Sequence, residues 1–251
     1  MNTATCRQSA TTAAARLATP LEPTCYMRPL PDNLPALDSA AGRRLFGEAL
    51  LDGGMASYFR LAQQFHTQAD PAFCGLGTLV CALNALGVDP SRQWKGPWRW
   101  FSEELLDCCK PLDEIRRSGV SLDDVACLAR CAGASVAVHR PDADSAGRGT
   151  GVERFRAHVI ESATREDAPV LIVNYSRRTL GQTGDGHFSP IGGYHAATDC
   201  VLVLDTARFK YPPHWVPVDV LFAAMQAEDL ATGQPRGWLR LRAAQPLRPR
   251  N

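Results

Sequence analysis

Residues 169–175, PVLIVNY, begin a series of three apolar runs that continues with HFSPIGGY (187–194) and CVLVLD (200–205). Each run has the length and the content of β-branched and aromatic residues that are typical of a buried strand. Thr198-Asp199 supplies turn residues between the second and third runs, so we expect these two to be neighbouring strands. Because helical patterns dominate the sequence before them, the order of elements predicts an α+β fold with an antiparallel sheet.

Helical patterns account for most of the sequence upstream of these runs. Apolar residues recur at helical spacing over residues 40–64, with a break at Gly53-Gly54. The clearest helix begins near Cys74 and is stopped by Gly87. Further helices are expected over 103–108, 122–131 and 152–162, and a strand over 135–139.

The composition excludes several classes of protein. The chain has 251 residues, of which 45% are hydrophobic, and 27 basic residues against 26 acidic ones give a net charge of +1. A nearly neutral chain has little of the attraction for phosphate that nucleic-acid binding requires, so we expect no nucleic-acid partner. No apolar stretch approaches the ~20 residues that cross a bilayer, so we expect no membrane partner. We expect a flexible arm over residues 1–40, one folded domain over 41–245 and a short tail over 246–251.

Nine cysteines are present, which is an odd number, and residues 1–20 contain no apolar signal region. This combination favours reduced thiols in the cytoplasm over a disulfide framework, although a transit segment containing Arg7 and Arg16 stays open as an alternative. Cys127 and Cys131 are four residues apart on an expected helix, so we expect them to share a buried face. No cysteine pair forms a C-x-x-C knuckle with two matched ligands, so no metal-ligating residue is predicted.

Cys74 is the candidate nucleophile. At the start of a helix, unpaired backbone N–H groups and the helix dipole favour an anion, so we expect a lowered thiol pKa there. Gly75 would let a substrate backbone approach the sulfur. Gln68, on the loop before the helix, is the candidate oxyanion donor together with the Cys74 backbone N–H. The alternative is that Cys74 is a small buried apolar residue.

His187 is the candidate base, since a thiolate nucleophile needs a group that also returns a proton to the leaving amine. If its strand and the next one are adjacent and antiparallel, Asp205 at the end of the next strand reaches the far imidazole nitrogen. A cysteine, then a distant histidine and an orienting polar residue, is the order found in papain-like enzymes. His195 and His214 are alternative bases, and Asp205 alternatively pairs only with Arg208.

Six blocks of the sequence resemble the catalytic domain of phytochelatin synthase, and the resemblance extends over about residues 45–240. They are QADPAFCG (68–75), NALGVDP (84–90), WKGPWRW (94–100), LDCC (106–109), QTGDGHFSPIGG (182–193) and DTARFKYPPHW (205–215). The resemblance implies a papain-like fold, in which a helical lobe carrying the nucleophile packs against an antiparallel sheet carrying the histidine and the aspartate. It also implies that residues 41–245 form the catalytic domain.

The resemblance implies the activity of a glutathione γ-glutamylcysteinyltransferase. Cys74, His187 and Asp205 would be its triad, and Gln68 would be its oxyanion donor. The thiolate would cleave the Cys–Gly amide of glutathione, release glycine, and pass the acyl group to a second glutathione, making phytochelatins for heavy-metal detoxification. No tightly bound cofactor is implied, because cadmium, zinc and copper ions act mainly through the metal–thiolate form of glutathione. The expected substrate-binding residues are Gly75, Arg177, Gly186, Arg208, Lys210 and Tyr211.

Two other functions stay open. The first is a hydrolase that releases glycine from glutathione or its conjugates, with water as the acceptor. The second is a non-enzymatic thiol protein that binds soft metal ions, which the nine cysteines favour and their scattered spacing disfavours. The sequence sets no oligomeric state, so a homodimer also stays open.

Overall fold

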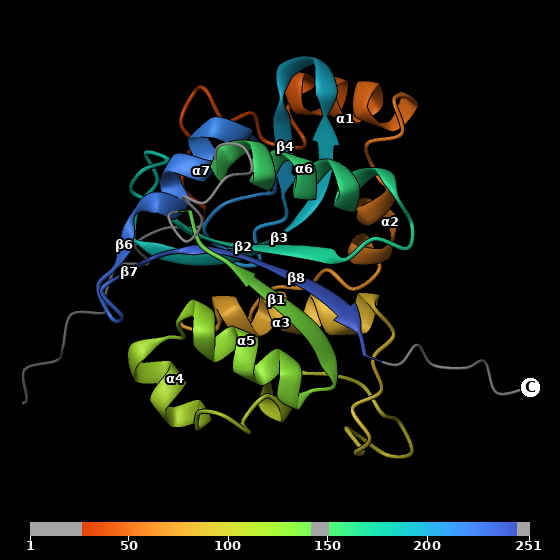
Figure 1. Cartoon of the computed structure of the whole chain (residues 1–251), viewed down its shortest axis with the longest axis vertical. Coiled ribbons are helices and arrows are strands. Elements are labelled where there is room, and N and C mark those ends of the chain that lie inside the picture. Colours follow the sequence, from red (N-terminus) through yellow and green to blue (C-terminus); the bar gives the residue numbers. More distant parts are fainter. Residues whose placement is uncertain (1–26, 142–150, 245–251) are drawn as a thin grey trace, which may run out of the picture.

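The computed structural model describes residues 27–141 and 151–244 (Figure 1). Its α-helices are α1 (Ala40–Leu51), α2 (Ala56–Ala62), α3 (Cys74–Ala85), α4 (Leu112–Ser118), α5 (Leu122–Cys131), α6 (Gly151–Thr164) and α7 (Val218–Gln226). Two short 3-10 turns are η1 (Glu103–Leu105) and η2 (Ala196–Thr198). The strands are β1 (Ala134–His139), β2 (Val170–Ser176), β3 (Gly186–His195), β4 (Cys200–Val203), β5 (His214–Pro217), β6 (Glu228–Asp229), β7 (Gln234–Pro235) and β8 (Gly237–Ala243).

Six of the strands form one antiparallel sheet in the order β1-β8-β2-β3-β4-β5. The expected neighbours β3 and β4 are paired, with His195 opposite Cys200 next to the turn. The sheet also contains β8, which the sequence patterns did not predict and which lies between β1 and β2. The predicted α+β class and its antiparallel sheet are therefore confirmed.

Helices cover both faces of this sheet (Figure 1). On one side lie α3, α4 and α5, and on the other lie α6 and α7. Alternate residues of β2 point to opposite faces, so Ile172 joins the core beneath α3 and α5 while Val173 joins the core beneath α6 and α7. Burial on both faces explains why the β2 sequence is apolar without alternation.

The central helix α3 is buried almost all round, because residues 75–83 are all buried. A helix without a polar face lies inside a fold, and α3 packs against β3, where the Thr78 hydroxyl donates to the Phe188 carbonyl oxygen at 3.1 Å. The neighbouring α5 begins as its sequence predicts, since the Ser121 and Asp124 side chains form a reciprocal capping box. These two helices and β3 form the frame of the site described below.

The structure differs from the sequence prediction between α3 and α5. The helix expected over 103–108 is only the short turn η1, and the unpredicted helix α4 forms after it. Glu103 faces inward, where its carboxylate accepts from the Ala69 backbone N–H at 2.9 Å. This tertiary contact outweighs the local helical pattern. It joins residues that are distant in the sequence, so the pattern could not reveal it.

The arm expected over residues 1–40 falls partly outside the described residues, which begin at Met27. Its described part packs against the domain, because Leu34 is buried and the Trp215 backbone N–H donates to the Pro35 carbonyl oxygen at 2.9 Å. The folded part of the chain therefore begins before residue 41. The tail expected over 246–251 lies outside the described residues.

Four cysteines are joined in pairs, which corrects the expectation of reduced thiols. One disulfide links Cys108 to Cys131 and another links Cys109 to Cys127, so the segment before α4 is tied to α5. Cys127 and Cys131 lie on the exposed side of α5 and not on a buried face, because its buried stripe is occupied by residues such as Leu128. The free cysteines among the described residues are Cys74, Cys81 and Cys200.

Candidate active site

Cys74 is the first residue of α3 and lies on the wall of a pocket of about 560 Å³. Gly186 and Phe188, which flank His187 in β3, line the same pocket. The Phe188 backbone lies near enough to the Cys74 sulfur to lower the pKa of its thiol. The structure therefore brings the predicted nucleophile to the strand that carries the predicted base.

His187 and Asp205 form a buried hydrogen-bonded pair. Antiparallel pairing of β3 with β4 returns the chain beside His187, and its Nε2 atom lies 2.8 Å from Asp205 Oδ1. The same oxygen accepts from the Ala207 backbone N–H at 2.9 Å. Among the described residues, His187 Nδ1 has no hydrogen-bond partner, and the Cys74 thiol is not yet bonded to it. Catalytic hydrogen bonds are often long or poorly aligned before substrate binds, and Nδ1 is the His187 nitrogen that is left open to a thiol.

Burial sets the protonation states of the nucleophile and the base. It raises the pKa of the Cys74 thiol, against the opposing effects of the Phe188 backbone N–H and the Arg177 charge. Burial and the Arg177 charge lower the pKa of His187 to about 4, against the opposing effect of Asp205. Both shifts favour a neutral thiol beside a neutral imidazole. The lowered thiol pKa expected from the helix dipole is therefore not found, because desolvation outweighs it.

The Asp205 carboxylate stays ionised in this buried site. Burial alone would raise its pKa, but His187 and Arg177 outweigh that effect and hold the pKa of the Asp205 carboxyl well below its usual range. An ionised Asp205 accepts a hydrogen bond, so the His187 proton sits on Nε2 and Nδ1 is left unprotonated.

Gln68 is buried in the loop before α3, but its amide is engaged within that loop. Its Nε2 donates to the carbonyl oxygens of Asp70 and Pro71 at 2.9 and 3.1 Å. Its Oε1 accepts from the Thr206 hydroxyl at 3.2 Å. Since Thr206 follows Asp205, Gln68 links the loop of the nucleophile to that of the aspartate. Its oxyanion role stays a prediction.

The two alternative bases have other partners. His195 Nε2 lies 3.0 Å from Glu48 Oε2, and its Nδ1 lies 2.8 Å from the Thr198 hydroxyl. His214 is fully buried, and its Nε2 lies 3.0 Å from the Gln182 amide nitrogen. Both histidines have both ring nitrogens engaged, so neither is placed to act as a base.

Of the two arginines expected to bind substrate, the structure buries one and exposes the other. Arg177 is 3% exposed, and its Nη2 lies 2.7 Å from Asp205 Oδ2, close enough for an ion pair although not aligned as a hydrogen bond. Arg208 is exposed, with its guanidinium carbon 5.2 Å from the Phe65 ring centroid. Asp205 therefore pairs with Arg177, not with Arg208. Arg177 is thus engaged by Asp205 and does not line the pocket, and its expected substrate-binding role stays a prediction.

Lys210 and Tyr211, also expected to bind substrate, both contact Thr183. Lys210 Nζ donates to the Thr183 carbonyl oxygen at 2.7 Å, and the Tyr211 hydroxyl accepts from the Thr183 backbone N–H at 2.9 Å. Tyr211 is buried, whereas Lys210 is partly exposed. Of these two residues, only Lys210 is accessible to a bound molecule.

The two glycines expected to admit substrate serve different purposes. Gly75 does not line the pocket, and a Cβ there would lie 2.4 Å from Val120 Cγ2, so close helix packing explains it. Gly186 does line the pocket, and a Cβ there would lie 2.3 Å from Arg236 Nη1. Gly186 thus makes room for a neighbouring guanidinium.

Sequence reasoning predicted none of the other polar side chains that line the pocket as site residues, among them Asn174, Asp229 and Arg236. Arg236 is buried, and its Nη1 lies 3.3 Å from Asn174 Oδ1 and 3.6 Å from Asp229 Oδ2. Its Nη2 lies 3.5 Å from Asp185 Oδ1, and its Nε has no hydrogen-bond partner among the described residues. Asn174 was detectable as a polar residue inside an apolar run, but Arg236 precedes the unpredicted strand β8 and carried no signal.

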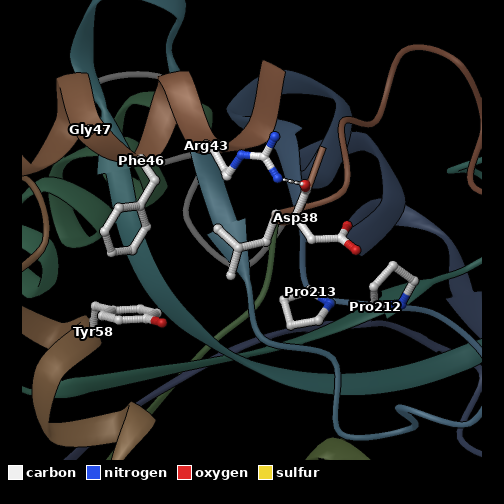
Figure 2. Close-up of a pocket in the computed structure, with 8 residues that line it drawn as sticks. Asp38, Arg43, Phe46, Gly47, Tyr58, Pro212 and Pro213 are labelled. Carbon is white, nitrogen blue, oxygen red and sulfur yellow. Dashed lines mark hydrogen bonds between the residues drawn. The ribbon is translucent and has the colours of Figure 1, made fainter. Parts of the chain in front are cut away.

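A second hollow, of about 600 Å³, lies between α1, α2 and the prolines Pro212 and Pro213 (Figure 2). Phe46 and Tyr58 meet edge to face in it, with ring centroids 4.8 Å apart. Its lining is mostly apolar and contains no cysteine or histidine. The pocket of Cys74 is therefore the candidate active site.

Two observations concern metals and membranes. The sulfurs of Cys108, Cys109 and Cys131 lie within 4.8 Å of one another, and these are the described residues whose positions would suit a metal ion. All three take part in the disulfides described above. Across 27–141 and 151–244, every helix is too short or too polar to span a bilayer.

Known proteins match most of this chain. The family model described as phytochelatin synthase matches residues 25–238. Glutathione gamma-glutamylcysteinyltransferase 1 of Triticum aestivum is 52% identical over 216 residues, which cover 85% of this chain and 42% of that protein. The protein of the same name from Arabidopsis thaliana is 48% identical over 85% of this chain and 43% of its own length, and the Schizosaccharomyces pombe glutathione gamma-glutamylcysteinyltransferase is 44% identical over 88% and 52%. The chain thus spans about half the length of these relatives, and it belongs to the phytochelatin synthase family.

Proposed function

We propose that the chain is a glutathione γ-glutamylcysteinyltransferase with Cys74 as its covalent nucleophile. The observation that carries the proposal is one pocket in which Cys74 lies beside the strand of His187 and a buried arginine, Arg236. His187 is in turn bonded to an ionised Asp205. The names of the relatives, which match most of this chain, support the same activity.

The first half-reaction forms an acyl-enzyme. Because burial keeps both groups neutral, the Cys74 proton passes to His187 Nδ1 as the sulfur attacks the carbonyl carbon of the Cys–Gly amide. The tetrahedral intermediate collapses, the C–N bond breaks, and the imidazolium gives its proton to the departing amine of glycine. Asp205 stabilises the imidazolium while it exists. A γ-glutamylcysteinyl thioester remains on Cys74.

The second half-reaction transfers that acyl group. The free amine of a second glutathione attacks the thioester carbon, and its proton passes to His187. A new amide forms, the carbon–sulfur bond breaks, and Cys74 recovers the proton as a thiol. Arg208, which is exposed, and Lys210, which is partly exposed, follow Asp205 in the sequence and suit the carboxylates of the acceptor.

The pocket offers complementary groups for the γ-glutamyl end of the donor. That end carries an α-carboxylate and an α-ammonium group. Arg236 has long contacts of 3.3–3.6 Å and an Nε without a hydrogen-bond partner among the described residues, so its guanidinium has capacity for a carboxylate. Asp229, on the same pocket wall, suits the ammonium group.

Metal ions enter this proposal as part of the substrate. Cadmium, zinc and copper prefer thiolate ligands, so a glutathione acceptor carries the metal on its sulfur and leaves its amine free to attack. We place the reaction in the cytoplasm, where the glutathione pool is kept reduced, and in that compartment we expect the two disulfides of α5 to be open. The catalytic domain in this proposal comprises the described residues, 27–141 and 151–244.

The test is product analysis by mass spectrometry after incubation with glutathione and a trace of cadmium or zinc. Oligomers of γ-glutamylcysteine that end in glycine, together with free glycine, are the expected products. If γ-glutamylcysteine and glycine are the sole products, water is the acceptor and the protein is a hydrolase. Unchanged glutathione with metal bound to the protein would overturn the enzymatic proposal.

A further inference from the structure

Arg177 is held from two sides inside the protein. Its Nη2 faces Asp205 at 2.7 Å, and its Nη1 donates to Gln182 Oε1 at 2.7 Å. The contact with Asp205 is not aligned as a hydrogen bond, so the bond to Gln182 is the directional contact that orients the guanidinium. The Tyr211 ring, 5.0 Å away, covers its face.

The chain of polar groups continues to His214 with a fixed direction. His214 Nδ1 lies 2.9 Å from the Pro212 carbonyl oxygen, which only accepts, so the His214 proton sits on Nδ1. His214 Nε2 must then accept from the Gln182 amide nitrogen, 3.0 Å away. This turns the Gln182 carbonyl oxygen toward Arg177. Burial lowers the pKa of His214, so the neutral imidazole that accepts this bond is the stable form.

We propose that Gln182 and His214 are positioning residues for the triad, acting through Arg177 on Asp205. This inference rests on the proposed function, because the roles of Asp205 and His187 are taken from the proposed reaction. Arg177, Gln182 and His214 form what we call the buried polar chain. It holds the Asp205 carboxylate so that Oδ1 faces His187 while Oδ2 faces the guanidinium.

Burial explains why each residue of the buried polar chain needs all of its hydrogen-bond and ion-pair partners. Gln182 is buried, and His214 and Asp205 are fully buried, so a broken contact cannot be replaced by water. Without the Gln182 oxygen, Arg177 Nη1 loses its partner and the guanidinium rotates away from Asp205. The aspartate then loses the contact that fixes its second oxygen, and the imidazole loses its orientation.

The Arg177 charge also sets the pH range of the reaction. The titratable and charged groups that face His187 are Cys74 from α3, Tyr175 from β2, Arg177 after β2, and Asp205 and Lys210 after β4. The Arg177 charge favours the Cys74 thiolate and disfavours the His187 imidazolium. If the Arg177 guanidinium is displaced, the pKa of the Cys74 thiol and the pKa of the His187 imidazole therefore both rise. A purely structural contact would not move them.

The test compares Gln182→Met, which keeps the size of the side chain but loses both hydrogen bonds, with wild type. We expect kcat for glycine release to fall by about tenfold with KM nearly unchanged, since the loss falls on the chemical step. We expect the pH profiles of glycine release and of Cys74 alkylation by iodoacetamide to move up by about half a pH unit. Ser57→Ala is the matched control, because it removes a buried 3.0 Å hydrogen bond to Gly192 that lies outside the buried polar chain.

Gln182→Glu is the second variant, to be used if Gln182→Met does not fold. Its carboxylate competes with Asp205 for Arg177, so both pH profiles should shift in the same direction. Unchanged profiles in a folded Gln182 variant would overturn the inference, and so would a lower kcat at an unshifted pH profile. Alkylation reports on Cys74 without any turnover. If wild type releases no glycine, the proposed function fails while this readout still decides the role of Gln182.

Discussion

His187 and His195 stand near the two ends of β3, and each bonds a carboxylate through its Nε2 atom. The distance is 2.8 Å to Asp205 in one case and 3.0 Å to Glu48 in the other, and both imidazoles are buried. Asp205 is fully buried, whereas the Glu48 side chain is 49% exposed. His195 Nδ1 is bonded to Thr198, whereas His187 Nδ1 has no such partner among the residues that the structure describes.

A histidine–carboxylate pair therefore does not by itself mark a catalytic site. The differences that matter are an open second nitrogen, a nearby nucleophile and a buried acid that cannot exchange its partner for water. His187 has all three. The start of β3 and the start of α3, which carries Cys74, lie on the same pocket. His195 lacks the open nitrogen and the buried acid, although the free cysteine Cys200 lies opposite it in β4, and it ties β3 to α1 through Glu48.

The largest expected effect comes from removing the sulfur of Cys74, which lies near the His187 end of β3. Cys74→Ser should lower glycine release by at least about a thousandfold, because a hydroxyl is a far poorer nucleophile beside this imidazole. Cys81→Ser is the control, since burial raises the pKa of the Cys81 thiol to about 12 and keeps it inert. Glycine release and acyl-enzyme mass are the measurements. Equal losses in both variants would show that no single thiol is the nucleophile.

The direct contrast uses the same substitution at both ends of β3. His187→Gln should reduce glycine release by about a thousandfold, while His195→Gln should leave the folded enzyme within about threefold of wild type. His195→Gln should instead lower the free energy of unfolding by roughly 1–3 kcal/mol, because its bonds to Glu48 and Thr198 are disturbed. Kinetics and urea unfolding on both variants measure this. Similar kinetic losses at both positions would remove the distinction between them.

Arg236 extends the contrast to substrate recognition at the His187 end. Arg236→Lys should raise KM for glutathione by roughly tenfold with a smaller change in kcat, because a lysine cannot form the bidentate contact with a carboxylate. Steady-state glycine release at varied glutathione measures both constants. An analogue of glutathione without the γ-glutamyl carboxylate should bind the variant and wild type equally. A KM unaffected by Arg236→Lys would argue against its role in donor binding.

The buried imidazole should also make the protein sensitive to acid. Burial lowers the pKa of His187 to about 4 from an ordinary value of 6.5, so between these values the unfolded chain binds a proton that the folded one does not. The free energy of unfolding should therefore fall as pH drops through this window, by on the order of 1 kcal/mol at pH 5 from this residue. Urea unfolding at pH 7 and pH 5 tests it. His187→Gln should weaken this pH dependence, and an unchanged slope would contradict the assignment.

The smallest effect on activity is expected at the disulfides, which lie away from both histidines. Cys108→Ser and Cys131→Ser should keep glycine release within about twofold of wild type, since neither sulfur lines the pocket. Each should lower the free energy of unfolding by roughly 1–3 kcal/mol, because the bond closes a segment of 23 residues. Kinetics and unfolding under oxidising and reducing conditions separate the two effects. A large kinetic loss would connect the disulfides to catalysis.

Local sequence patterns predicted the elements that position the triad. The helix from Cys74 and the paired strands around Thr198-Asp199 have their signals within a few residues, so spacing and turn chemistry identified them. The meeting of His187 with Asp205 followed from antiparallel pairing alone. These features depend on short-range physics, which a single sequence contains.

The features that were missed depend on contacts between distant segments. Strand β8 enters between β1 and β2, and Arg236 reaches the pocket because it precedes that strand. Arg177 was expected to bind substrate because of the family resemblance, and its burial against Asp205 was not foreseen. The disulfides join residues 23 and 18 positions apart, and no spacing rule specified their partners. Burial decides each of these cases, and it is a property of the whole fold.

Gly186 lies next to His187 in β3 and also packs against the Arg236 guanidinium. It precedes the imidazole that moves protons, and the absence of its side chain leaves the space filled by Arg236. A methyl group there would displace the guanidinium that we propose for the donor and would shift the backbone next to the proposed base. In the proposed reaction, a substitution at this position therefore affects donor binding and proton transfer together, whereas substitutions on another wall of the cavity can change donor preference alone.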